Sequence, residues 1–381
     1  PGVSPVGGGQ ATTWAIVAGG GTAGHVLPGL AVARALVARG HPSASVHWVG
    51  SRIGIEARLV PEAGFGVTLL PGRGIERRVS RTSVVAAAGL AAAMAAGVAL
   101  VARRRPAVVV ALGGYASVPC AFAAVALRVP LVVCEQNAVP GAANRTLARF
   151  ARAAAVSFPG TDLPRARVTG NPVRSEILAI DRRGDRDEAR AALGLPADRR
   201  VVAAFGGSLG ARRINLAVVA ALRRWAGRAD LALRHVVGRR DWTLVDESAP
   251  DLSDAALVYA PIEYEDRMDL VLAAADLAVC RAGATTVAEL AVVGLPSVLV
   301  PLPGAPGDHQ TANARHLVAA GAAVLVPDAE LDGDRLADEV DALLADPDTL
   351  ERMSRAASGF ARRDAAEAVA ALVEEHARGG R

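Results

Sequence analysis

Lysine is absent from this chain of 381 residues, and all 42 basic side chains are arginines. Aromatic residues make up only 3% of the sequence, whereas 52% is apolar, mostly alanine and valine. We attribute this bias to genome composition rather than to function. The formal net charge of +4 permits anionic partners, but the placement of charge decides more than the total. We expect no nucleic-acid partner.

Cysteine is scarce and shows no metal-ligand spacing. The three thiols, Cys120, Cys134 and Cys280, lie in apolar surroundings, which favours buried free thiols in a reducing compartment. Residues 1–11 are rich in glycine, proline and serine and lack the basic-then-apolar pattern of a signal peptide. We expect these residues to form a flexible tail.

One charge-free run has the length of a membrane span. Residues 84–102 contain no charged side chain, but alanine and glycine contribute little to membrane insertion. Arginines flank the run on both sides. The sequence therefore favours a helix packed on a sheet over a true span, and leaves open a partly exposed helix that touches a bilayer.

Glycine, in contrast, is concentrated in two turns that carry most of the information. Gly19-Gly20-Gly21-Thr22-Ala23-Gly24-His25 and Gly206-Gly207-Ser208-Leu209-Gly210 each follow an apolar run and precede a helical pattern. A strand, a glycine turn and a helix N-terminus form a cradle for phosphate, because backbone N–H groups and the helix dipole point at the anion. Two such units predict two nucleotide-binding folds across one cleft.

Strands alternate with helices throughout the chain, which predicts α/β domains with doubly wound parallel sheets. The expected strands are 14–18, 46–49, 67–70, 108–112, 131–133 and 155–158 in the first half, and 201–205, 233–237, 257–259, 277–280, 297–300 and 323–326 in the second. Two further helices are expected near 334–345 and 365–377. A Gly-Asn-Pro turn at 170–172, followed by a charged run, indicates a domain junction. We expect domains at 12–172 and 173–358, with 359–381 forming a helix that packs back on the first domain.

Polar residues at the carboxyl ends of strands are the candidates for a site in such folds. His25 follows the first glycine turn, near a helix N-terminus that disfavours imidazolium and so favours a neutral, basic ring. Gly113-Gly114-Tyr115 and Glu135-Gln136-Asn137 follow two further strands. Taken singly, each has a structural alternative: a surface histidine, an ordinary turn or a satisfied turn.

The second half offers a matching set. Residues 281–289 place small side chains at another helix N-terminus, with Glu289 within its first turns, where a carboxylate can accept two sugar hydroxyls. The alternative is a glutamate that only caps the helix dipole. Gln310 and Asn313 are three residues apart and share a helical face. They can hold sugar hydroxyls, or simply form a solvated helix start.

Seven segments in order resemble the MurG family, the peptidoglycan N-acetylglucosaminyltransferases that convert lipid I to lipid II. The carriers are GGGTAGHVLPGLAVA, ALGGYASVP, EQNAVPGAANR, GNPVR, GGSLGARRIN, CRAGATTVAE and the DHQTAN segment. The resemblance covers nearly the whole chain. It implies a GT-B fold and an inverting transfer from UDP-GlcNAc to the MurNAc O4 hydroxyl of lipid I. The donor would bind the C-terminal domain, and the acceptor would bind the N-terminal domain at the cytoplasmic face of the cell membrane. A role in cell-wall biogenesis, cell shape and cell division would follow, and cell-wall synthesis proteins are possible partners.

The resemblance also implies roles for individual residues. His25, Glu135 and Tyr115 match positions important to catalysis. The implied contacts with UDP-GlcNAc are Thr22, Ala23, Gly24, Asn137, Arg174, Ser208, Asn215, Glu265, Ala284, Thr285, Thr286, Val287, Ala288, Glu289, Gln310 and Asn313. Three departures stand out: Ala23 in place of a common glycine, Leu209 in place of the usual glutamine, and His309-Gln310 where two glutamines are frequent.

Charge placement adds an expected membrane surface. Residues 72–105 hold seven arginines and one acid, a net charge of +6. Basic and apolar side chains on one face are typical of docking on anionic lipid, although a merely solvated basic face is the alternative. The expected docking residues are Ile75, Arg77, Arg78, Val79 and Arg81.

Glycosyl transfer needs a base and stabilisation of the departing diphosphate. The seven segments that resemble the MurG family contain no Asp-x-Asp cation motif, so we expect neither a metal nor a cofactor. The alternatives are another GT-B enzyme (a lipid or natural-product glycosyltransferase, or a UDP-GlcNAc 2-epimerase), a non-catalytic nucleotide-sugar-binding or scaffold protein, and an NAD-dependent dehydrogenase. The second strand ends without the acid that holds an NAD ribose, which disfavours the dehydrogenase.

Overall fold

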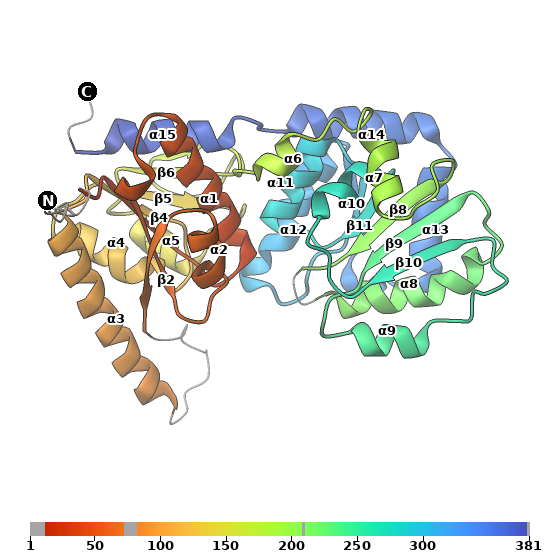
Figure 1. The fold of residues 1–381 in the computed structure, drawn as a ribbon, viewed down its shortest axis with the longest axis horizontal. Coiled ribbons are helices and arrows are strands. Elements are labelled where there is room, and N and C mark those ends of the chain that lie inside the picture. Colours follow the sequence, from red (N-terminus) through yellow and green to blue (C-terminus); the bar gives the residue numbers. More distant parts are fainter. Residues whose placement is uncertain (1–11, 72–81, 208–209, 379–381) are drawn as a thin grey trace, which may run out of the picture.

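Two α/β domains lie side by side in the structure, a computed structural model that describes residues 12–71, 82–207 and 210–378 (Figure 1). Each domain is built on one parallel sheet. The central strands, such as those at Ala15–Ala18, Val108–Ala111, Leu131–Glu135 and Leu277–Cys280, are buried on both faces, as parallel strands covered by helices are. The predicted GT-B architecture is therefore confirmed.

The N-terminal domain has the sheet order β3-β2-β1-β4-β5-β6-β7. Its strands are β1 (Ala15–Ala18), β2 (Val46–Ser51), β3 (Gly66–Leu70), β4 (Val108–Ala111), β5 (Leu131–Glu135), β6 (Ala153–Val156) and β7 (Ala166–Val168). Its helices are α1 (Ala23–Ala38), α2 (Glu56–Glu62), α3 (Thr82–Arg104), α4 (Ser117–Ala126) and α5 (Ala142–Leu147).

The C-terminal domain has the sheet order β10-β9-β8-β11-β12-β13. Its strands are β8 (Arg200–Phe205), β9 (Leu231–Val236), β10 (Val258–Ile262), β11 (Leu277–Cys280), β12 (Ser297–Leu299) and β13 (Ala323–Leu325). Its helices are α6 (Ser175–Leu178), α7 (Arg186–Ala192), α8 (Arg212–Trp225), α9 (Trp242–Ser248), α10 (Met268–Ala274), α11 (Ala284–Val293), α12 (His309–Ala319), α13 (Gly333–Leu344) and α14 (Pro347–Phe360).

The strand order reverses next to β1 in one sheet and next to β8 in the other. Such switch points open a crevice at the carboxyl ends of the strands, where α/β folds bind ligands. Each glycine turn follows one of these two strands. The topology therefore places both turns at the sheet edges where such folds bind ligands.

The edge strand β7 and the helices α6, α7 and α14 were not predicted, and β6 and β9 each begin two residues earlier than expected. β7 is a three-residue strand at the sheet edge with all three residues exposed, so it lacks the apolar run that reveals the buried strands. β6 starts at Ala153 rather than at residue 155. The helix α14 begins at Pro347, with the side chain of Asp346 accepting the Thr349 N–H at 2.9 Å as its cap.

The C-terminal helix α15 (Ala365–His376) lies along the N-terminal domain (Figure 1). Its buried residues Val369, Leu372 and Val373 join the apolar core formed by α1 and the strands of that domain. At the helix end, Glu374 accepts hydrogen bonds from Arg39 at 2.6 Å and from His41 at 2.9 Å. The chain therefore crosses between the domains twice.

Helix α3 packs against α4 and also contacts β3 of the sheet, as expected of a packed helix over residues 84–102. Gly97 allows this close approach, because a Cβ there would lie 2.8 Å from Cβ of Pro119. Ala93, Leu100 and Val101 are buried, and they share a core with strands of the sheet. Within the residues that the structure describes, no helix is long and apolar enough to cross a membrane.

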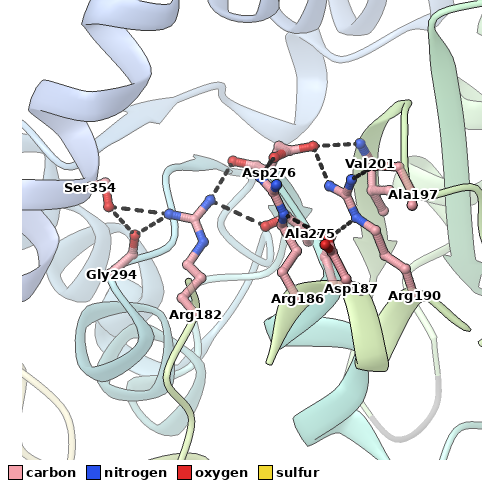
Figure 2. A network of polar contacts seen from close by, with 11 residues as sticks. Arg182, Arg186, Asp187, Arg190, Ala197, Val201, Ala275, Asp276, Gly294 and Ser354 are labelled. Carbon is pink, nitrogen blue, oxygen red and sulfur yellow. Dashed lines mark hydrogen bonds and ion pairs between the residues drawn. The ribbon is translucent and has the colours of Figure 1, made fainter. Parts of the chain in front are cut away.

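The charged run after the junction turns out to be a structural clamp (Figure 2). Asp276 accepts a hydrogen bond from Arg190 at 2.8 Å and from the backbone N–H of Val201 at 2.7 Å. Arg182 donates to the carbonyls of Ala275, Asp276 and Gly294. These bonds satisfy buried polar groups and tie the segment to the C-terminal sheet.

Candidate active site

His25 is the third residue of α1 and stands directly after the first glycine turn. The turn needs glycine at position 21, where φ is +93°. Thr22 precedes α1 as its N-cap residue, and its hydroxyl lies 3.3 Å from Nδ1 of His25. The turn therefore fixes where the imidazole stands.

Burial lowers the pKa of His25, which keeps the ring neutral and basic at neutral pH. Glu135 and Glu56 oppose this shift through their negative charge, and His309 reinforces it. A neutral imidazole that has carboxylates nearby to stabilise its protonated form has the properties of a general base.

Gly113 and Gly114 follow β4 with φ of +93° and +75°. A Cβ on Gly113 would lie 3.2 Å from Nε2 of His25, so a side chain there would press on the ring. The next residue, Tyr115, is partly buried, and its hydroxyl finds no partner among the described groups. Burial raises the pKa of this phenol, so it is protonated at neutral pH and could serve as a hydrogen-bond donor.

Glu135, at the end of β5, is 3% exposed and binds its own loop. One carboxylate oxygen accepts the N–H of Asn137 at 2.9 Å, and the other accepts from Gly141 N at 3.0 Å and from Asn144 Nδ2 at 2.9 Å. Through these contacts Glu135 holds the loop at 137–141 in shape. Its negative charge also acts on His25.

The side chain of Asn313 joins the two domains. Its Oδ1 accepts the N–H of Ala138 at 2.8 Å, while its Nδ2 donates to Oδ1 of Asn137 at 3.1 Å and to the carbonyl of Ala282 at 3.2 Å. The residue is fully buried. With both amide hydrogens already donated to protein groups, Asn313 has none left for a sugar hydroxyl in this arrangement.

Arg174 and Glu289 form a second connection, between the junction and α11. The guanidinium donates to one carboxylate oxygen of Glu289 from Nε at 3.1 Å and from Nη2 at 2.9 Å. Burial raises the pKa of Glu289, and Arg174 opposes that shift. Since these bonds engage only Oε1, the other oxygen is available to accept ligand hydroxyls.

The N-terminus of α11 has the geometry of an anion site. The first hydrogen bond of the helix runs from the N–H of Val287 to the carbonyl of Gly283 at 2.9 Å. The N–H groups of Ala284, Thr285 and Thr286 come before it and have no partner within the helix. The side chain of Val287 is buried in the core, and Ala288 packs against that core. The contribution of this stretch is therefore mainly through its backbone.

Gln310 stands at the start of α12, close to the same helix end. Its side-chain oxygen accepts the N–H groups of Ala282 at 3.2 Å and Leu302 at 3.0 Å. The side-chain NH₂ is thereby oriented as a donor, which suits a sugar oxygen. His309, next to it, uses Nδ1 to bind the carbonyl of Pro306 at 3.0 Å.

Asn215 lies behind the second glycine turn rather than on its surface. It is fully buried; its Nδ2 donates to the carbonyl of Val237 at 3.0 Å, and its Oδ1 lies 3.0 Å from Nε2 of His235. A Cβ on Gly210 would overlap that same carbonyl. Asn215 therefore supports the turn from beneath instead of touching a ligand.

Glu265 is also occupied by protein contacts. Its carboxylate accepts from Arg234 at 2.7 Å and from the backbone N–H of Arg267 at 2.9 Å. A contact of Glu265 with UDP-GlcNAc stays a prediction. Other expected site residues lie outside the described residues: Ser208, Ile75, Arg77, Arg78, Val79 and Arg81, together with the departure Leu209.

Sequence reasoning missed Glu56, which is fully buried beneath the first glycine turn. Its Oε2 accepts the N–H of Gly21 at 2.8 Å, and its Oε1 accepts the N–H of Ser51 at 2.7 Å. The available signal was a carboxylate at a helix start, with Gly50 and Gly54 shortly before it.

The sequence models of glycosyltransferase family 28 match both domains. The model of the family's N-terminal domain matches residues 15–156, and that of its C-terminal domain matches residues 201–369. Together they cover most of the chain.

Individual relatives agree with this result. A UDP-N-acetylglucosamine–N-acetylmuramyl-(pentapeptide) pyrophosphoryl-undecaprenol N-acetylglucosamine transferase from a Nocardioides species is 44% identical over 360 residues, which cover 94% of this chain and 97% of the relative. The crystal structure of Acinetobacter baumannii MurG covers 95% of this chain and 99% of its own with a TM-score of 0.76 at 28% identity.

A UDP-N-acetylglucosamine 2-epimerase from Listeria monocytogenes shares the fold at 15% identity with a TM-score of 0.69, covering 96% of each chain. At that identity the likeness shows the fold alone. The family matches and the 44% identical relative carry more information, and from them we conclude that this chain belongs to the MurG family within glycosyltransferase family 28.

Proposed function

We propose that this protein transfers GlcNAc from UDP-GlcNAc to the MurNAc O4 hydroxyl of lipid I and so forms lipid II for peptidoglycan. The relatives named for this reaction are 44% identical over nearly the whole chain. The observation that carries the proposal is the position of His25, a partly buried imidazole beside the first glycine turn, where this domain faces the α11 N-terminus and Gln310 of the other.

The reaction is a single displacement at C1 of GlcNAc. The acceptor O4 forms the new bond to C1 on the face opposite the leaving group, the bond from C1 to the UDP oxygen breaks, and the configuration inverts. His25 accepts the proton that O4 loses. The bond electrons leave with UDP, whose diphosphate gains negative charge.

The chain has groups suited to that charge. The free N–H groups of Ala284, Thr285 and Thr286 and the dipole of α11 stabilise an anion without reorganisation. The unengaged oxygen of Glu289 would accept ribose hydroxyls, and the NH₂ of Gln310 would donate to the sugar. Thr22, Ala23, Gly24 and Asn137 would complete the donor site from the N-terminal domain.

The acceptor is a lipid, and we propose that the protein docks peripherally on the cytoplasmic face of the membrane. Residues 72–105 carry a net charge of +6 in the sequence. On the described surface of the same domain, Phe122 of α4 is 51% exposed and Phe150 is 62% exposed. Exposed aromatic rings and a basic segment in the same domain suit an anionic lipid surface.

Measuring UDP release from UDP-GlcNAc, with and without a lipid I analogue, tests the proposed reaction. We expect release only when the acceptor is present, together with a disaccharide product. An epimerase would consume UDP-GlcNAc without the lipid and form no disaccharide, and a binding or scaffold protein would release no UDP. Because we expect no metal requirement, the rate should be the same in EDTA as with added Mg²⁺. Absence of disaccharide with an intact, UDP-binding protein would overturn the proposal.

A further inference from the structure

Glu56 is a buried carboxylate that the reaction scheme does not use. It opens α2 and is fully buried. Both of its oxygens accept backbone N–H groups, from Gly21 at 2.8 Å and from Ser51 at 2.7 Å. Burying a carboxylate is costly unless such bonds compensate, and an apolar side chain could fill the same space. What this residue offers over an apolar one is its two acceptors and its charge.

The backbone around Glu56 leaves room for the carboxylate. A Cβ on Gly20, Gly50 or Gly54 would overlap the Glu56 side chain. These glycines come from the first glycine turn, the end of β2 and the loop that follows it. None of the three has a positive φ, so backbone conformation alone does not account for glycine there. The need to leave space for the Glu56 carboxylate does account for it.

The bond to Gly21 connects Glu56 with the catalytic helix. Gly21 leads directly into Thr22, the N-cap residue of α1, and the N–H of His25 bonds the carbonyl of Thr22 at 3.1 Å. Fixing the N–H of Gly21 therefore fixes the first turn of α1. We propose that Glu56 is a positioning residue, which clamps the first glycine turn from beneath and sets the place of His25. The part of this proposal that concerns catalysis rests on the proposed function.

Charge gives Glu56 a second effect on the same group. Four influences set the pKa of His25: burial lowers it, Glu135 on β5 and Glu56 on α2 raise it, and His309 on α12 lowers it. When His25 accepts the acceptor proton, the carboxylate of Glu56 stabilises the imidazolium. Removing this charge should lower the pKa of His25 further.

The variant Glu56→Gln retains the shape of the side chain but loses the charge and replaces one acceptor by a donor that faces an N–H group. We expect backbone amides in the segments 19–25 and 50–55 to exchange with solvent at least about tenfold faster. We also expect kcat to fall by about tenfold or more. The acid limb of the kcat–pH profile should move to lower pH, because the loss of the Glu56 charge lowers the pKa of His25 and the base stays neutral further into acid.

Glu62→Gln is the matched control, because Glu62 lies on the same helix and forms an exposed ion pair with Arg58. It should change neither exchange nor the pH profile. Glu56→Asp retains the charge but shortens the reach, so it should loosen the turn while leaving the acid limb nearly in place.

A pair of variants covers the case in which Glu56→Gln folds poorly. Gly54→Ala should displace the carboxylate and loosen segment 19–25 in the wild-type background, but have no further effect when combined with Glu56→Ala. Unchanged exchange in Glu56→Gln, or additive effects in the pair, would overturn the clamp. Faster exchange with an unmoved acid limb would overturn the electrostatic part. Amide exchange needs no substrate, so it separates a failure of this proposal from a failure of the proposed reaction.

Discussion

At the scale of single residues, the catalytic role depends on one neutral imidazole. Burial holds the pKa of His25 below its ordinary value of 6.5. A general base works in its deprotonated form, so activity is lost only as the pH falls through the lowered pKa. The acid limb of the kcat–pH profile should therefore lie below pH 6.5, which a rate profile between pH 4 and 9 would reveal.

Replacing His25 by alanine removes the proton acceptor. We expect kcat to fall by roughly 10²–10⁴-fold, while UDP binding measured by calorimetry stays close to that of the wild type. His376→Ala is a suitable control, because that histidine lies at the end of α15 and not beside the glycine turns. Near-normal turnover in His25→Ala would contradict the assignment.

Neighbouring residues divide into those that face the ligand space and those that hold others in place. Gln310 and the second oxygen of Glu289 retain free hydrogen-bonding capacity, whereas Asn313 and Asn215 spend theirs on protein groups. The sequence motifs identified all four together. Only the geometry separates them, because the direction of an amide is set by partners that are distant in sequence.

At the scale of elements, the contact between α3 and α4 is sensitive to the size of the side chain at position 97. A Cβ on Gly97 would lie 2.8–2.9 Å from Pro119 atoms, so a larger residue must push the helices apart. We expect Gly97→Leu to destabilise the protein by about 1–3 kcal/mol, seen as a lower midpoint in thermal or urea unfolding.

Ala95→Leu serves as the control for Gly97→Leu, because Ala95 lies on the same helix and is exposed. It adds the same side chain without a clash and should leave the midpoint nearly unchanged. Equal midpoints for the two variants would show that α3 does not pack on α4 as described.

The elements themselves could largely be predicted from the sequence, for a physical reason. Parallel strands covered on both faces are continuous apolar runs, and β1, β4 and β8 show that pattern. The exposed edge strand β7 has no such run. The clamp by Glu56 could not be predicted either, since it depends on a helix start folding back under a turn formed 35 residues earlier.

At the scale of the whole molecule, the two domains are joined at two kinds of place. The chain crosses between them twice, before α6 and before α15. Asn313 of the C-terminal domain also bonds Asn137 and Ala138 of the N-terminal domain. Asn137 and Asn313 both belong to the expected donor site. Binding of UDP-GlcNAc at this site would therefore contact residues that also hold the two domains together.

Docking on a membrane is the other property of the whole molecule. Its expected centre, residues 72–81, lies outside the described residues. The charge of this segment in the sequence and the exposed rings of Phe122 and Phe150 support docking. Each arginine near an anionic surface contributes about 1 kcal/mol. Added salt screens this attraction over a Debye length of about 8 Å at physiological ionic strength.

Binding to phosphatidylglycerol or cardiolipin vesicles should therefore weaken steadily as salt rises. Losing three arginines should weaken it by roughly 100-fold at low salt, while transfer to a soluble acceptor analogue stays nearly intact; the substitutions are Arg77→Ser, Arg78→Ser and Arg81→Ser. The control removes the same charge from the C-terminal domain, with Arg183→Ser, Arg352→Ser and Arg355→Ser. If both triple variants lost binding equally, the attraction would depend on total charge rather than on this surface. Membrane retention of the wild type that resists high salt and carbonate would contradict peripheral docking, because an electrostatic contact cannot survive screening.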